Sequence, residues 1–143
     1  MIKTFRGKLE TDEQDRIYLS GGGEKEAYRI VKLQILPHNF NVTDEYNVKV
    51  FKTKQTTSTT TIDFDSDDLI AAAYFENSAG VGSEGTYANT VIFDNEVFNQ
   101  DIFITLKSQS DNSCNYYLEL EEMKIKDPEI AVVNYRAALL HGE

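Results

Sequence analysis

Apolar and polar residues alternate in short runs along most of the chain, which is the period of a β-strand that buries one face. Clusters of turn-forming residues separate these runs. The pattern predicts an all-β domain, an antiparallel β-sandwich or jelly roll with short helical turns at most. Runs of this kind occupy residues 5–9, 16–19, 27–36, 46–52, 90–93, 102–106 and 115–120.

The same alternation predicts which side chains share a face of each strand. In residues 27–36, one face is expected to carry Val31, Leu33 and Ile35, and the other Tyr28, Ile30, Lys32 and Gln34. In residues 46–52, Tyr46, Val48 and Val50 are expected to share a face. In residues 115–120, the residues expected to share a face are Tyr116, Leu118 and Leu120.

Two segments allow more than one secondary structure. Residues 69–75 include three alanines and fit either a strand or one or two helical turns. Near the C-terminus, Asp127 and Pro128 are typical of a helix start, whereas the β-branched and aromatic residues at 132–135 favour a strand. Both alternatives stay open at the level of sequence.

Three stretches are predicted to be loops. The glycines at 21–23 indicate a chain reversal, and the Thr-rich residues 53–61 favour an exposed loop over an edge strand. Residues 77–86 contain small and glycine residues that bury little area, which makes this loop a candidate contact surface. The 143 residues are expected to form one domain, with arms at about 1–4 and about 127–143.

Composition changes the picture by indicating which partners are disfavoured. The formal charge is −10, with 24 acidic against 14 basic residues, so the average field repels nucleic acid and anionic lipid. Apolar runs are shorter than the roughly 20 residues that span a bilayer, so we expect no membrane partner. Hydrophobic residues make up 41% of the chain, which is enough for a packed core.

The single cysteine and the two histidines do not form a catalytic pattern. Cys114 lacks an intramolecular disulfide partner and is expected to be a buried or partly buried thiol. His38 and His141 lie in turn and tail sequence without metal-ligand spacing. The start of the chain is polar without a signal-peptide core, which favours synthesis in a reducing cytosol.

One acidic stretch has part of a calcium-binding pattern. Asp63, Asp65 and Asp67 alternate as the first ligands of an EF-hand loop do. The sixth position is Asp68 where glycine is required, and the twelfth is Tyr74 where a bidentate glutamate belongs. We therefore expect a solvated acidic turn, without a metal or another cofactor.

Other groups of residues also have ordinary explanations. Phe93, Phe98 and Phe103 surround a turn rich in amides, where they are expected to be core anchors and not the walls of a ligand pocket. Glu119 and Glu121 form a carboxylate pair of the sort that glycosidases use, but such pairs arise by chance among 24 acidic residues. The sequence thus predicts that the protein is not an enzyme.

Several segments resemble small virion structural proteins of marine tailed bacteriophages. The segments are RIYL at 16–19, YRIVK at 28–32, IFDNEVFNQDI at 92–102 and CNYYLELE at 114–121. The resemblance implies a β-rich auxiliary capsid protein, of the decoration or cement kind, that binds and bridges subunits of the major capsid protein. It also implies location on the capsid exterior after assembly in the host cytoplasm.

Assembly on a symmetric shell would favour homo-oligomers of this chain. The loops at 53–61 and 77–86 and the two terminal arms are the segments expected to make contacts between subunits. Within the C-terminal arm, the expected anchors are Ile130, Val133, Tyr135 and Leu139, whose alternative role is packing in the protein's own core.

Other functions stay open beside this one. The resemblance also allows a neck, tail or fibre component. The acidic turn and the eight tyrosines allow a carbohydrate- or calcium-binding β-sandwich. An enzyme on a jelly-roll scaffold would need clustered histidine and carboxylate ligands, which this spacing does not provide.

Overall fold

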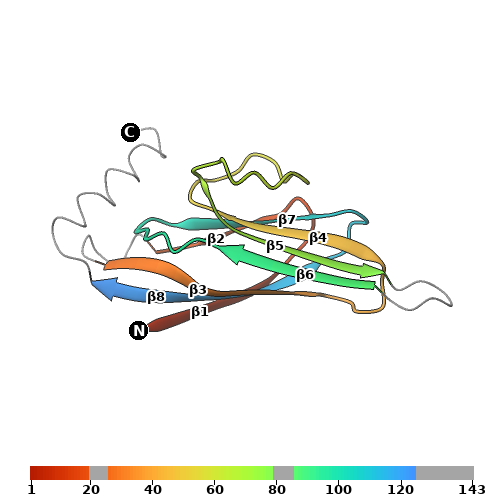
Figure 1. The fold of residues 1–143 in the computed structure, drawn as a ribbon, viewed down its shortest axis with the longest axis horizontal. Helices are drawn as coiled ribbons and strands as arrows, with labels where there is room; N and C mark the ends of the chain where they lie inside the picture. Colours follow the sequence, from red (N-terminus) through yellow and green to blue (C-terminus); the bar gives the residue numbers. More distant parts are fainter. Residues whose placement is uncertain (20–25, 79–85, 125–143) are drawn as a thin grey trace.

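The computed structural model describes residues 1–19, 26–78 and 86–124, which form two antiparallel sheets packed face to face (Figure 1). This confirms the predicted all-β sandwich, and no helix occurs within these ranges. The finer assignment as a jelly roll stays a prediction. The three-stranded sheet has the order β1 (Ile2–Leu9), β8 (Cys114–Lys124), β3 (Glu26–Pro37), and the five-stranded sheet β2 (Gln14–Ile17), β7 (Ile102–Ser108), β4 (Asp44–Phe51), β5 (Leu69–Ser78), β6 (Thr86–Phe93).

The core lies between the two sheets and follows the predicted alternation in most strands. Tyr46, Val48 and Val50 of β4 are fully buried, and the three predicted residues of β8 are buried as well. These inward side chains meet in one cluster, so the sheets share a single hydrophobic core.

The predicted faces of β3 are wrong in its first half. Tyr28 and Ile30 are buried on the same side as Leu33, whereas Val31 is only partly buried. The pairing of β3 with β8 shifts between Ile30 and Lys32, so Val31 is the extra residue of a β-bulge. A bulge reverses the alternation of side chains, which a strict period of two cannot anticipate.

The ambiguous segment at 69–75 belongs to β5, a strand. Ala73 pairs with Val48 of β4 on one side and with Val91 of β6 on the other. Pairing on both sides gives the backbone N–H and C=O groups of the segment hydrogen-bond partners. In a helix of one or two turns, most of these groups would lack a partner within the helix.

The two predicted strands near the N-terminus are confirmed, with a turn between them. Asp12 in this turn has a φ of 68°, and Glu10 N donates to Glu13 Oε1 at 2.7 Å. β1 and β2 lie in different sheets, so the turn forms a corner of the sandwich. The predicted N-terminal arm is corrected, because residues 2–4 pair with β8 and belong to β1.

The predicted aromatic anchors are confirmed at two of three positions. Phe98 and Phe103 are buried, but Phe93, at the end of an edge strand, is 38% exposed. Asp101 accepts a hydrogen bond of 2.6 Å from Leu19 N, which is a side-chain bond to backbone of the expected kind.

Residues 52–68 connect β4 to β5 without forming a strand, so the loop predicted at 53–61 is confirmed. This Thr-rich loop lies over the outer face of the five-stranded sheet (Figure 1). Lys49, which is 3% exposed, fixes it there by donating from Nζ to Thr59 Oγ1 at 2.9 Å and to Thr61 O at 2.7 Å.

Several predictions fall outside the described residues. They concern the glycine loop at 21–23, the middle of the loop at 77–86 and the C-terminal arm at 127–143. The arm contains the helix-or-strand alternative and the expected anchors Ile130, Val133, Tyr135 and Leu139. Among the residues that are described, no helix has the length and apolar character required to cross a membrane.

Candidate functional site

The outer face of the three-stranded sheet carries an unusual charge for this chain, and we call it the cationic face. Register and alternation place side chains of all three strands on this face, with each residue of β8 between one residue of β1 and one of β3. Its residues are Ile2, Thr4, Arg6 and Lys8 of β1, Asn115, Tyr117, Glu119 and Glu121 of β8, and Arg29, Lys32, Gln34 and Leu36 of β3. The cationic face therefore carries four cationic side chains and two carboxylates, although the net charge of the chain is −10.

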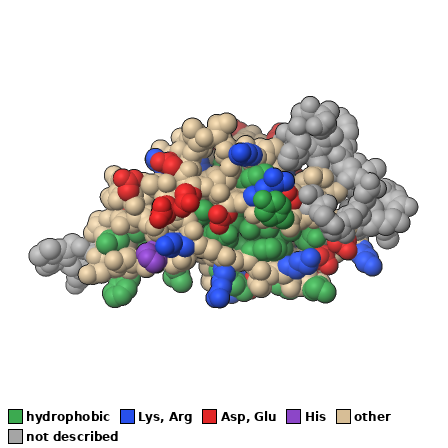
Figure 2. Space-filling view, turned by 180° about the vertical axis from the view of Figure 1, so that it is seen from behind, with side chains coloured by type: hydrophobic (Ala, Val, Ile, Leu, Met, Phe, Trp, Pro, Cys, Tyr) green, Lys and Arg blue, Asp and Glu red, His purple; other side chains and the backbone are tan. Residues whose placement is uncertain are grey.

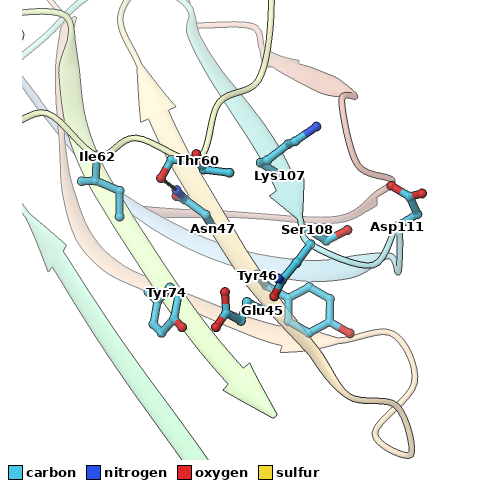
Figure 3. A pocket seen from close by; sticks show the side chains of 10 residues that line it. Glu45, Tyr46, Asn47, Thr60, Ile62, Tyr74, Lys107, Ser108 and Asp111 are labelled. Carbon is cyan, nitrogen blue, oxygen red and sulfur yellow. Dashed lines mark hydrogen bonds between the residues drawn. The ribbon is translucent and has the colours of Figure 1, made fainter. Parts of the chain in front are cut away.

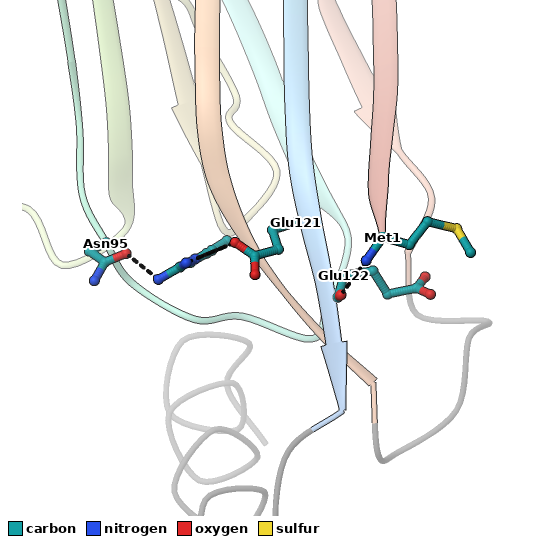
Figure 4. Close-up of polar contacts among 5 residues, drawn as sticks. Met1, Asn95, Glu121 and Glu122 are labelled. Atoms are coloured by element: carbon teal, nitrogen blue, oxygen red, sulfur yellow. Dashed lines mark hydrogen bonds and ion pairs between the residues drawn. The ribbon is translucent and has the colours of Figure 1, made fainter.

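The two carboxylates of the cationic face are engaged by neighbours. Glu121 accepts from Arg29 Nη2 at 2.8 Å, and Arg29 Nη1 also donates to Asn95 Oδ1 at 3.2 Å (Figure 4). Glu119 accepts from the Tyr117 hydroxyl at 2.7 Å, and this bond raises the pKa of Tyr117. The acidic groups are therefore occupied within the face.

The cations at the other end of the face remain available. Arg6 and Lys8 are exposed, and no carboxylate of the described residues forms an ion pair with either. They border a groove of about 710 Å³ together with Tyr117 and Leu36, whose side chain is 67% exposed. Basic and hydrophobic side chains alternate along the lower rim of the space-filling view, at the level of the three-stranded sheet in Figure 1 (Figure 2).

A second candidate site is a pocket of about 450 Å³ between the Thr-rich loop and the five-stranded sheet (Figure 3). We call it the polar pocket. Three neighbouring strands form its floor, because Asn47 of β4 stands opposite Lys107 of β7 and Tyr74 of β5. Thr60 and Ile62 of the Thr-rich loop form its upper wall.

The polar groups that a ligand could reach in this pocket are of mixed charge. Glu45, Gln109 and Asp111 are exposed, and Lys107 Nζ is held by Asp12 at 3.1 Å. The balance of acidic, basic and amide groups suits a neutral, hydroxyl-rich ligand better than an ion.

Tyr74 supplies the aromatic surface of the polar pocket. Partial burial raises the pKa of Tyr74 to about 12, and the nearby Glu45 and Glu76 carboxylates add to the effect. The hydroxyl is therefore protonated at neutral pH and donates to Glu76 Oε2 at 3.4 Å. The ring remains half-buried beside the apolar Ile62.

The floor of the polar pocket also contains unsatisfied atoms. Asn47 Oδ1 and Ser108 Oγ are buried without a hydrogen-bond partner among the described residues. Such atoms are uncommon in folded proteins. Both lie below the accessible surface, so a bound ligand would meet the exposed groups of the rim first.

The acidic turn that sequence suggested as a metal site does not converge on a centre. Asp63, Asp65 and Asp67 are exposed, and Asp63 Oδ1 accepts the Asp65 N–H at 2.9 Å in a local turn. Asp68 points elsewhere and accepts from the side chains of Thr53 and Gln55 at 2.6 and 2.7 Å. Within the described ranges, no group of three or more potential ligands is arranged to hold a metal ion.

Cys114 is buried, as the sequence predicted. Its side chain is 1% exposed, and burial raises the pKa of the thiol to about 12. A thiol with such a pKa is protonated at neutral pH and a poor nucleophile. His38 lies in an exposed turn after β3, without a role in either candidate site.

Sequence reasoning missed both candidate sites. The alternation of Arg6 and Lys8 with inward residues was visible, but the neighbours of β1 were not, because strand order is not encoded in local pattern. The polar pocket joins residues about 60 positions apart on three strands, and only the register brings them together.

Comparison with protein-family models and with curated proteins finds no match to this sequence.

Proposed function

We propose that the chain is a non-enzymatic binding protein that attaches to a larger protein assembly through its cationic face. The observation that carries the proposal is the concentration of Arg6, Lys8, Arg29 and Lys32 on one sheet face of a chain with a charge of −10. Exposed apolar groups accompany the charges, with Leu36 at 67% and Ile2 at 49%. Apolar anchors beside charged groups are the composition of a protein-binding surface.

The assembly that we propose is a tailed-bacteriophage particle, with the major capsid protein as partner. The resemblance of four segments to virion structural proteins supports this choice. Two of these segments contribute to the cationic face, since YRIVK at 28–32 belongs to β3 and CNYYLELE at 114–121 belongs to β8. An acidic patch on the partner would complement the face and accelerate docking.

The test is binding of the purified chain to particles that lack it, measured by co-sedimentation. We compare Lys8→Glu with Lys54→Glu, because Lys54 is an exposed cation on the Thr-rich loop and the change of charge is the same. Lys8→Glu should weaken attachment about tenfold, which corresponds to about 1.4 kcal/mol, and Lys54→Glu should not.

A second pair of variants tests the apolar part of the face. Leu36→Ser and Phe64→Ser remove side chains of nearly equal exposure, 67% and 63%, but only Leu36 lies on the cationic face. Equal binding by all four variants would refute the face as attachment surface. Absence of the chain from purified native particles would refute the virion role.

The polar pocket favours a second candidate function, the binding of a neutral carbohydrate. Tyr74 and Ile62 provide an apolar wall, and Glu45, Gln109 and Asp111 provide hydrogen-bond partners for hydroxyl groups. Titration calorimetry against a glycan panel tests this function. Tyr74→Ala should abolish the heat, while Tyr18→Ala, which truncates a 75% exposed tyrosine elsewhere, should retain it.

A further inference from the structure

β6 differs from the other edge strands of the sandwich. The two sheets end in β1, β3, β2 and β6, each paired on one side within the described structure. Natural proteins protect such edges with charges, proline, bulges, short strands or a covering segment, because open backbone groups can pair with another chain.

Three of the edges have protection of this kind. β2 is only four residues long, and β1 carries Lys3, Arg6 and Lys8. β3 has a bulge and ends at Pro37, and its first part is covered where Tyr28 N donates to Phe98 O at 2.8 Å.

β6 has none of these features among the residues that the structure describes. Its sequence TYANTVIF contains no charged residue, no proline and no glycine, and its pairing with β5 continues without a break. Ile92 is 47% exposed, Phe93 is 38% exposed and Thr90 is exposed. A β-branched, uncharged edge of this length favours the addition of another strand.

The open backbone groups of β6 can be assigned from the ladder. Asp94 N donates to Ile70 O at 3.0 Å, and hydrogen-bonded pairs alternate along an antiparallel ladder. Ile92 and Thr90 therefore bond to β5, while Asn89, Val91 and Phe93 direct their N–H and C=O groups away from it. These three residues also border a groove of about 370 Å³ between β6 and β3.

We propose that β6 pairs with β6 of a second copy of this chain, in antiparallel orientation, and joins the two five-stranded sheets into one. An antiparallel pair of identical strands is self-complementary, as a two-fold interface requires. With the axis at Val91, that residue pairs with its own copy and Asn89 pairs with Phe93.

The lack of charge on β6 permits a second copy as the occupant at this edge. Two chains of −10 repel each other over most of their surfaces, and the uncharged β6 is the edge where they can approach with least repulsion. Screening by salt should therefore strengthen self-association, whereas it should weaken attachment through the cationic face. This inference is independent of the proposed function, because it concerns the purified chain alone.

The experiment is sedimentation velocity of the full chain from low-micromolar to near-millimolar concentration, at low and high salt. We expect a monomer–dimer equilibrium that shifts toward dimer at high salt. Ile92→Lys places a cation on the edge and should abolish the dimer. Ile2→Lys is the matched control, because Ile2 is 49% exposed on the protected edge β1.

A backbone variant separates strand pairing from general surface effects. Asn89→Pro removes an N–H that points away from β5, so it should abolish the dimer with little change in melting temperature. Thr90→Pro removes an N–H that bonds to β5 and should lower the melting temperature instead. A chain that stays monomeric at every concentration, or a dimer that survives both Ile92→Lys and Asn89→Pro, would overturn the proposal.

Discussion

Asp44 is predicted to be the most important polar side chain for the stability of the turn that leads from β7 to β8. The residue begins β4 and is 2% exposed. Its Oδ1 accepts from Glu45 N at 2.7 Å and Ser110 N at 2.8 Å. Its Oδ2 accepts from Asn112 N at 3.2 Å and Asn112 Nδ2 at 2.9 Å. One buried carboxylate therefore satisfies four donors.

The variant Asp44→Asn keeps the shape of the side chain and removes half of its acceptors. The new amide group cannot accept, so two donors lose their partner, and hydrogen bonds to a charged group contribute about 1.5–3 kcal/mol each. Because such contributions are not additive, we expect unfolding to become easier by about 3 kcal/mol. For a chain of this size that corresponds to a fall in melting temperature of about 10 °C.

Urea denaturation followed by circular dichroism measures this change, provided that the dependence on urea concentration is the same for both proteins. Asp63→Asn is the control, because Asp63 is exposed and accepts one backbone N–H in the Thr-rich loop. It should cost less than about 1 kcal/mol. If Asp44→Asn cost no more than Asp63→Asn, the carboxylate would not hold the turn and the reasoning would be wrong.

Three further predictions concern a half-buried glycine and two buried side chains. Gly7→Ala should destabilise the fold by about 1–3 kcal/mol, because the added Cβ would lie 2.9 Å from the Tyr116 hydroxyl. The loss of stability should be smaller in a Tyr116→Phe background, and a double-mutant cycle measured by urea denaturation tests this. Cys114 should resist thiol reagents in the native state and react fully once unfolded, because it is buried with a pKa of about 12. Burial lowers the pKa of Lys49 from 10.5, so unfolded chains bind its proton more tightly. The stability of wild type relative to Lys49→Met should therefore increase as pH rises toward 10.5 in chemical denaturation, and a flat difference would contradict this.

Local pattern predicted the strands well because burial of one face imposes a period of two on the sequence. It could not find the bulge at Val31, since one extra residue leaves the composition of the strand unchanged and only reverses the alternation. Local pattern also could not decide between helix and strand at residues 69–75. Three alanines fit either structure, and the decision came from pairing with β4 and β6.

The candidate sites were harder to predict for a related reason. The cationic face depends on β8 lying between β1 and β3, although β8 is far from both in the sequence. From the sequence, Arg6 is an ordinary surface residue. It becomes part of a cationic cluster only because the sheet places Arg29 and Lys32 on the same face. The unprotected edge of β6 is similar, because a strand is an edge only by its place in a sheet.

The two proposed surfaces act together. Antiparallel pairing places directly opposite residues on the same face of a sheet, so a β6 pair leaves both three-stranded sheets on one side of the joined sheet. Both cationic faces would then point outward on that side, away from the joined sheet and toward the same target. Attachment of one face would raise the effective concentration of the other and increase affinity without new kinds of contact. A dimer of this form is suited to a target that repeats the same acidic surface, as a symmetric shell does, and it would bridge two of the target's subunits.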